Sequence, residues 1–201
     1  MPDYSWAERD DWEKAWEPLA AQIGHDFAEG GPYDALDPIE RGAVRRYLEP
    51  LEFDCPLHYD ADVARAHGHP DIIAPYSGLA TWISTGVWNP GDEPVYGGDH
   101  GADRNAHARM RRNPYPLPGP DINGRFATDL EYEYVRAFVV GDQLSSRGRR
   151  LLSVMPKETS VGRGAFLTWG SEVRNQDDVL IVRVRFGVYN YVARRQGDTG
   201  A

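Results

Sequence analysis

The segment from Ser77 to Trp88 constrains the fold of this chain more strongly than any other segment does, because none of its twelve residues is charged. A stretch of this length is too short to cross a bilayer as a helix, which takes about 20 apolar residues. A helix that is uncharged all round is buried in the core of a protein. The sequence therefore predicts a buried helix over these residues.

The last third of the chain has the pattern of β-strands. From Val182 to Tyr191, apolar side chains mostly alternate with polar ones, which is the period of a strand with one buried face. Runs rich in Val, Leu, Phe, Tyr and Arg lie near 127–140, 143–155, 164–174 and 178–192. Turn-forming residues at 141–142 and 175–178 separate them. Four strands with short links predict an antiparallel sheet, and helices followed by a sheet predict an α+β fold.

The first third of the chain predicts three helices. The first helix is expected from Ser5 to Ile23, because the apolar residues of this segment recur at helical spacing. These residues are Trp6, Trp12, Trp16, Leu19 and Ile23. Asp37 as N-cap, Pro38 at the first helical position and Glu40 in a capping box predict a second helix that ends near Pro50. A short third helix is expected from Asp60 to Gly68.

The chain is expected to form one domain over residues 1–201, since its length fits a single medium domain. Residues 1–36 form an N-terminal helical extension in this division. Residues 89–124 form an irregular insertion, because six prolines with glycines between them fall there. A long loop of this kind is often functional, and we expect it at the mouth of a binding site or on a partner chain.

Charge and cysteine content exclude several classes of function. Lys and Arg number 22 against 31 Asp and Glu, a net charge of −9, which argues against binding nucleic acid or an anionic membrane surface. The N-terminus is polar and acidic, unlike a signal peptide. The single cysteine, Cys55, excludes an internal disulfide, so the cytoplasm is the expected compartment.

The loop before the third helix concentrates ionisable side chains. His58 is the best candidate for a general acid–base group, with Asp54 and Glu52 as the neighbouring carboxylates. A structural role for a single loop histidine is the alternative. A nucleophilic role for Cys55 is much less expected, because nothing in the sequence indicates a base placed to activate it. No metal is expected either, because the spacing of His58, His67 and His69 does not place them on one helical face.

Five motifs, in order, resemble the N-terminal-type domain of MaoC-like dehydratases over about three-quarters of the chain. They are Ala43–Tyr47 before the catalytic loop, Pro56–Asp60 in that loop, Ile72–Pro75 leading to the central helix, Val140–Leu144 at a strand turn and Val173–Gln176 at a late hairpin. The resemblance implies the hotdog fold, an antiparallel sheet wrapped around a central helix. It also implies hydration of enoyl thioesters, or the reverse dehydration, with an acyl-CoA or acyl-carrier thioester as substrate and no cofactor.

The catalytic loop departs from the family pattern Gly-Asp-x-Asn-Pro-Leu-His. His58 matches the family histidine, but Phe53 stands at the aspartate position and Cys55 at the asparagine position. Asp54 or Glu52 would have to replace the missing carboxylate, or this chain is the degenerate half of a pair whose partner reacts. The resemblance implies a homodimer or heterodimer of hotdogs in either case. A non-catalytic acyl-CoA-binding or scaffolding subunit is the alternative, and a hotdog thioesterase is less expected because Ser77–Trp88 has no carboxylate.

Two further groups are expected to hold the thioester. The backbone N–H groups of Tyr76, Ser77 and Gly78, at the start of the buried helix, are candidates to polarise the thioester carbonyl. Arg109, Arg111 and Arg112 are candidates for contacts with the phosphates of coenzyme A. A solvated loop in which these arginines pair with neighbouring acidic residues is the alternative.

Overall fold

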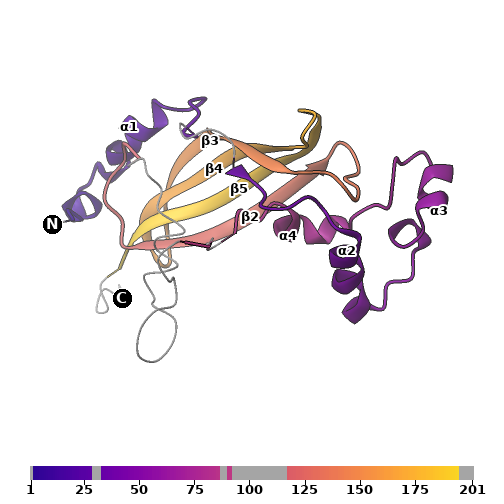
Figure 1. Ribbon diagram of the computed structural model, residues 1–201. Helices are drawn as coiled ribbons and strands as arrows, with labels where there is room; N and C mark the ends of the chain where they lie inside the picture. Colours follow the sequence, from indigo (N-terminus) through magenta and orange to yellow (C-terminus); the bar gives the residue numbers. More distant parts are fainter. Residues whose placement is uncertain (1, 29–32, 87–89, 92–116, 195–201) are drawn as a thin grey trace.

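A curled antiparallel sheet dominates the computed structural model, which describes residues 2–28, 33–86, 90–91 and 117–194 (Figure 1). The strands lie in the order β1-β3-β4-β5-β2. Their bounds are β1 Tyr33–Asp34, β2 Gly124–Tyr134, β3 Ser145–Thr159, β4 Gly162–Arg174 and β5 Leu180–Ala193. The antiparallel sheet is confirmed, and β3, β4 and β5 begin and end within about four residues of the expected runs.

The strand β2 ends earlier than expected, at Tyr134 rather than near residue 140. The residues that follow leave the sheet and pair with the lead-in segment 72–75 instead. Ala74 N donates to Phe138 O at 2.9 Å, and Val140 N donates to Ile72 O at 2.9 Å. The residues after Tyr134 therefore pair with segment 72–75, a long-range partner that the spacing of the sequence does not reveal.

Two clusters of buried side chains cover one face of the sheet at its two ends. The first joins the helices to the sheet and contains Ile39, Val44, Leu48, Ile72, Leu79, Trp82, Phe138, Leu144, Val173 and Val182. The second joins the N-terminal segment to the sheet and contains Trp6, Trp12, Trp16, Leu19, Phe27, Leu151, Ala165, Leu167, Trp169 and Val188. Two different parts of the chain, the helices α2 and α4 and the N-terminal segment, therefore bury apolar side chains against the same sheet.

The N-terminal extension is not the continuous helix that its periodicity predicts. It is broken into the 3₁₀ turns Ser5–Glu8 and Trp12–Trp16 and the short helix α1 Glu17–Ala20. Its apolar residues are buried on the sheet as expected, except Ile23, which is 51% exposed. The three tryptophans pack against a curved sheet, and burial of these large rings decides the backbone path more than helix propensity does.

The second helix, α2 Arg41–Leu48, begins later than the capping-box prediction, which is wrong at Asp37. Asp37 lies in a bend and Glu40 is extended, and Ile39 between them pairs with the turn before β3: Ile39 N donates to Asp142 O and Gly141 N donates to Ile39 O, both at 2.9 Å. The third helix, α3 Ala61–Ala66, is confirmed. The side chain of Asp60 accepts from the N–H groups of Asp62 and Val63, and Gly68 follows with a φ of +87°.

The buried helix is much shorter than expected. A 3₁₀ turn, Tyr76–Gly78, leads into α4, which covers only Leu79–Trp82 and lies with α2 at one end of the sheet (Figure 1). Leu79 and Trp82 are buried, whereas Ala80, Thr81 and Ser84 are exposed. Leu36 N donates to Ser84 O at 3.1 Å, so segment 35–36 takes a carbonyl that a longer helix would use. The absence of charge reflects one buried face and one uncharged exposed face.

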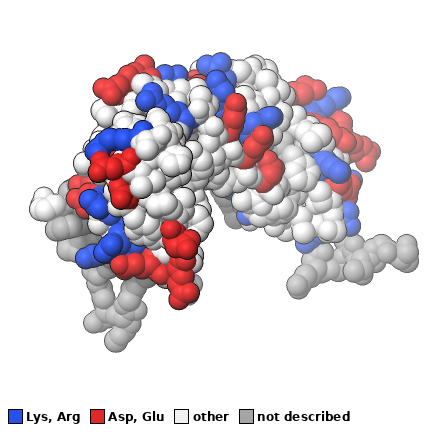
Figure 2. All heavy atoms as spheres, turned by 90° about the vertical axis from the view of Figure 1, so that its right-hand side faces the viewer, with Lys and Arg blue, Asp and Glu red and all other residues white. Residues whose placement is uncertain are grey.

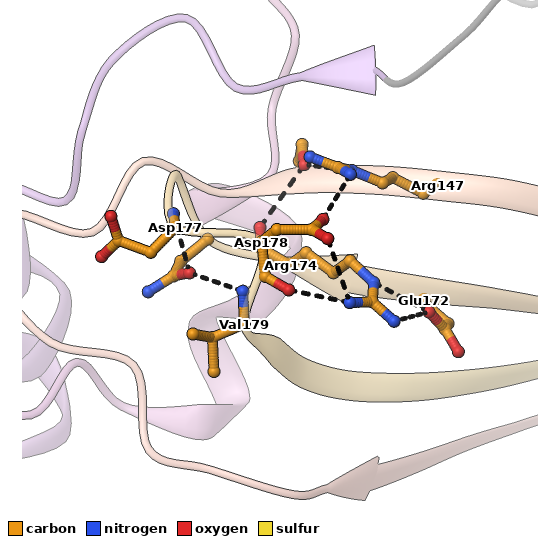
Figure 3. A network of polar contacts seen from close by, with 8 residues as sticks. Arg147, Glu172, Arg174, Asp177, Asp178 and Val179 are labelled. Carbon is orange, nitrogen blue, oxygen red and sulfur yellow. Dashed lines mark hydrogen bonds and ion pairs between the residues drawn. The ribbon is translucent and has the colours of Figure 1, made fainter.

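Two of the motifs that resemble the dehydratase family meet at the turn after β4. Asn175 is buried and donates from Nδ2 to Asp142 Oδ1 at 3.2 Å, while its Oδ1 accepts from the N–H groups of Asp177 and Val179. Arg174 bridges Glu172 and the carbonyl of Asp178 beside them (Figure 3). This network ties the β4–β5 turn to the turn before β3.

Acidic and basic side chains are mixed over the face of the molecule seen from the side of α3 (Figure 2). The net negative charge is therefore not gathered into one acidic half on this face. Among the described residues, no helix is long and apolar enough to cross a membrane.

Candidate functional site

The loop that carries His58 is held by backbone hydrogen bonds to the lead-in segment. His58 lies at the end of the 3₁₀ turn Pro56–His58, which Pro56 starts with its restricted φ. Ile73 N donates to Leu57 O at 3.1 Å, and Asp60 caps α3 directly afterwards. The half-buried imidazole is thus fixed between an N-capped helix and the strand-like segment 72–75.

A hydrogen bond determines the tautomer of His58. The Nδ1 atom lies 2.6 Å from Ile73 O, and a carbonyl oxygen only accepts, so Nδ1 carries the hydrogen. In the neutral ring, Nε2 then has a lone pair. An imidazole oriented through Nδ1 in this way is suited to take a proton at Nε2 and return it.

The neighbouring carboxylates do not reach this imidazole. Glu52 and Asp54 are exposed, and among the described residues neither side chain has a hydrogen bond or ion pair. Glu52 has a φ of +48°, which turns the loop at this point. The ring of Phe53 lies beside His58 instead, with 5.5 Å between ring centroids.

A tyrosine keeps the loop in this arrangement. Tyr59 Oη donates to Phe53 O at 2.6 Å and so closes the loop across the histidine. Phe53 is 48% exposed and packs on His58 at an angle of 56°. The loop therefore presents a ring, not a carboxylate, at the position where the family has its aspartate.

The three residues expected to polarise a carbonyl are not equivalent. The N–H of Gly78 donates to Pro75 O at 3.0 Å within the 3₁₀ turn and is not available to a ligand. The N–H groups of Tyr76 and Ser77 donate no hydrogen bond to another described residue. Both residues are exposed at the start of a short helical segment.

The start of this turn is linked to His58 through the hydrogen bond between His58 and Ile73. Ile73, which accepts from His58, precedes Tyr76 by three residues, a span of at most about 11 Å. Ile73 also forms an isolated bridge with Val139. The structure thus brings the histidine loop and the turn at Tyr76 to the same end of the sheet.

Sequence reasoning missed the aromatic side chains around this turn. The rings of Tyr76 and Tyr134 are stacked, with 4.4 Å between centroids and 9° between planes, and Tyr134 Oη donates to Tyr76 O at 2.9 Å. Burial raises the pKa of the Tyr134 hydroxyl, so it stays a donor at neutral pH. The i, i+2 spacing of Tyr132 and Tyr134 in the sequence is the signal that could have placed both on one face of β2.

The remaining candidates do not join the site. His67 Nδ1 lies 2.8 Å from Val63 O, so this side chain is engaged at the end of its own helix. Cys55 is half-buried as a free thiol. Arg109, Arg111 and Arg112 lie outside the described residues, as does most of the insertion 89–124.

The FAS1-like dehydratase domain region is the family model that matches this chain, over residues 21–184. The chain belongs to this family. The match includes the histidine loop, the turn at Tyr76, β2 to β4 and the first five residues of β5. The resemblance to MaoC-like dehydratases and the hotdog fold is therefore confirmed for this dehydratase-family chain.

Curated relatives are longer than this dehydratase-family chain. It is 27% identical over 194 residues to a probable enoyl-CoA hydratase alpha subunit of Thermomonospora curvata, covering 94% of the chain and 55% of the relative. It is 27% identical over 146 residues to the 3-oxo-4,17-pregnadiene-20-carboxyl-CoA hydratase alpha subunit of Mycobacterium tuberculosis, covering 68% of the chain and 40% of the relative. The chain thus spans about half the length of these relatives.

Solved structures share the fold of this dehydratase-family chain. A chain of the ChsH1-ChsH2 complex from Mycobacterium tuberculosis has a TM-score of 0.59 at 21% identity, covering 92% of this chain and 93% of that one. A MaoC-like dehydratase has a TM-score of 0.51 at 20% identity, covering 87% and 44%. At these identities the likeness concerns the fold alone.

Proposed function

We propose that this chain is a subunit of an enoyl-thioester hydratase or (R)-3-hydroxyacyl-thioester dehydratase, and that a partner hotdog chain carries the water-activating pair. Membership of the dehydratase family supports the reaction class. Hydration adds water across a double bond without oxidation or reduction, so the reaction needs no redox cofactor. The thioester, on coenzyme A or on a carrier, is the substrate.

The arrangement around His58 is the observation that carries this proposal. Water addition needs a group that accepts a proton and a second group that holds the water in place. His58 is oriented for the first role through Ile73, but the side chain that packs beside it is the ring of Phe53 and not a carboxylate. Half of the pair is therefore missing from this loop, and a second chain is the simplest source of a complete pair.

The edge of the sheet supports a partner chain. β2 is the last strand in the sheet order, so one side of its backbone has no neighbouring strand among the described residues. Two apolar residues on it, Phe126 and Leu130, are 42% and 53% exposed. A long edge strand with exposed apolar side chains is a template for pairing with another strand.

A reaction by this chain alone is the second candidate, and the orientation of His58 favours it. In that case Nε2 takes a proton from water, the hydroxide adds to the β-carbon and a proton returns to the α-carbon. Asp54 or Glu52 would have to move to His58 to hold the water. A non-catalytic acyl-binding or scaffolding role is the remaining alternative, and it needs none of these groups.

An enoyl-hydration assay separates the three. Crotonyl-CoA is mixed with the purified chain, with the hotdog chain that co-purifies with it from its source cells, and with both, and loss of enoyl absorbance is followed. We expect turnover by the complex and none by this chain alone. Turnover by this chain alone would support its own active site, and equal turnover by the partner with and without it would leave a scaffolding role.

A further inference from the structure

A pocket on the sheet lies outside the histidine site and is rich in both aromatic side chains and arginine. It measures about 470 Å³, within the range of small-molecule sites. Trp169, Phe186 and Tyr33 give it aromatic surface, and Arg125, Arg149 and Asn190 give it polar groups. None of the residues that line it belongs to the loop of His58 or the turn at Tyr76.

The position of the pocket follows from the strand register. Trp169 on β4 pairs with Phe186 on β5, and Asn190 on β5 pairs with Arg125 on β2, so the set spans neighbouring strands (Figure 1). Trp169 and Val188, which also lines the pocket, belong to the buried cluster under the N-terminal segment. Phe186 is 37% exposed beyond this cover. The pocket is thus a part of the sheet that the N-terminal segment leaves open.

The two arginines of the pocket are held in place by its other residues. Arg125 Nε donates to Oδ1 of the buried Asn190 at 2.8 Å. The two terminal nitrogens of Arg125 donate to no other described residue. The guanidinium of Arg149 lies 4.5 Å from the ring centroid of Trp169. Burial lowers the pKa of Arg149, with the nearby Arg125 as a further cause.

The charges of this pocket differ from those of another large groove on the sheet, which Arg183 and Glu133 line. In that groove arginines are matched by acids, as in the pairs of Arg183 with Glu133 and Arg174 with Glu172. In the aromatic pocket, by contrast, no ion pair is formed by Arg125 with the described residues, and no Asp or Glu is among the described residues that line it. In a chain with a net charge of −9, such a pocket is complementary to an anion.

We propose that this pocket binds a planar, largely apolar molecule that carries a carboxylate, with the rings of Trp169 and Phe186 against its body and Arg125 on its charge. A guanidinium with two free nitrogens fits a carboxylate with two parallel hydrogen bonds. Its tether to Asn190 prepares this geometry before the ligand arrives. The inference goes beyond the proposed function and does not depend on it, since binding needs no group of the histidine site.

Calorimetric titration of the full chain with 2-naphthoate and with its uncharged counterpart 2-naphthamide tests this proposal. We expect naphthoate to bind about tenfold more tightly, because the two molecules differ only at the group that faces Arg125. High salt is expected to reduce this preference. No binding of naphthoate up to its solubility limit, or equal binding of the two molecules, would overturn the proposal.

Variants of the chain locate the site. Arg125→Met should remove the preference for naphthoate and leave naphthamide binding nearly unchanged, and Phe186→Ala should weaken both ligands. Arg183→Met, on the other groove, is the matched control and should change neither. If Arg183→Met removes the preference as well, or if Arg125→Met retains it, the anion binds elsewhere and the assignment is wrong. If a variant does not fold, the effect of salt on the preference of the wild-type chain for naphthoate over naphthamide still tests whether a charge contact binds the carboxylate.

Discussion

His58 is well oriented but lacks a carboxylate beside it, and this combination leads to a test in the assembled enzyme. If the partner carries the reaction, His58→Ala and Asp54→Asn should each leave hydration of crotonyl-CoA by the complex within about threefold of the wild type. A positioned acid–base group contributes about 10²- to 10⁴-fold, so a loss of about 100-fold or more in either variant would place the reaction on this chain. The measurement is kcat/KM of the complex with each variant.

Asp26 stabilises the start of the sheet through its charge. Its Oδ1 accepts from the N–H groups of Arg149 and Ala28, and the bond from Arg149 is the main cause that lowers the pKa of this carboxyl below its ordinary value of 3.8. A lowered folded-state pKa contributes stability above the unfolded-state value, and this is lost as the pH falls through the folded-state value.

We therefore expect Asp26→Ala to cost about 1 kcal/mol or less at pH 7, since the group is exposed to solvent. The difference between wild type and variant should shrink below a pH of about 4. Urea unfolding at pH 7 and at pH 3 measures it. A difference that stays constant between these two pH values would contradict the role of the charge.

At the scale of elements, the N-terminal segment acts as a cover for the sheet rather than as a regular helix. Trp16 is 1% exposed and meets the ring of Trp6 edge-on, with 5.7 Å between centroids. Trp16→Ala should lower the free energy of unfolding by about 3 to 5 kcal/mol. Ile23→Ala, at a half-exposed position of the same segment, should change it by less than about 0.5 kcal/mol.

The indole nitrogen of Trp16 refines this test. Nε1 is buried and has no hydrogen-bond partner among the described residues. Trp16→Phe removes this unpaired N–H and should therefore cost clearly less than Trp16→Ala. Thermal or urea unfolding of the three variants checks the order, and similar losses for Trp16→Ala and Ile23→Ala would show that the segment is not a cover.

The cap of α3 links an element to the candidate site. Asp60 accepts from the N–H groups of Asp62 and Val63, and it follows His58 by two residues. Asp60→Ala should cost about 1 kcal/mol of stability, while Asp60→Asn should retain most of it because the amide oxygen still accepts. Equal losses in the two variants, measured by urea unfolding, would mean that the side chain does not act as a cap.

At the scale of the whole molecule, the open edge at β2 predicts assembly. Leu130→Lys places a charge on the exposed apolar surface of this strand and should weaken the complex with a partner hotdog by about tenfold or more. Met155→Lys, equally exposed on β3, is the control and should leave the complex intact. Analytical ultracentrifugation of mixed chains measures both. Weakening by Met155→Lys alone would move the interface to β3.

Much of the fold followed from the sequence, because it depends on local alternation and on turn chemistry. The strands β3, β4 and β5 and the start of α3 at Asp60 were predicted from these signals. The resemblance of five motifs indicated the dehydratase family, which the family model confirms. The roles of His58, Tyr76 and Ser77 remain predictions.

Contacts between distant segments decided the rest. Residues 37–40 are not helical because Ile39 pairs with residues 141–142, and α4 is short because Leu36 takes the carbonyl of Ser84. The orientation of His58 comes from Ile73, fifteen residues later. The helical period of the tryptophans was present without a regular helix, since burial of the rings on a curved sheet outweighed it. Sequence spacing carries local preferences, whereas competition for the same backbone groups is settled only when the chain is folded.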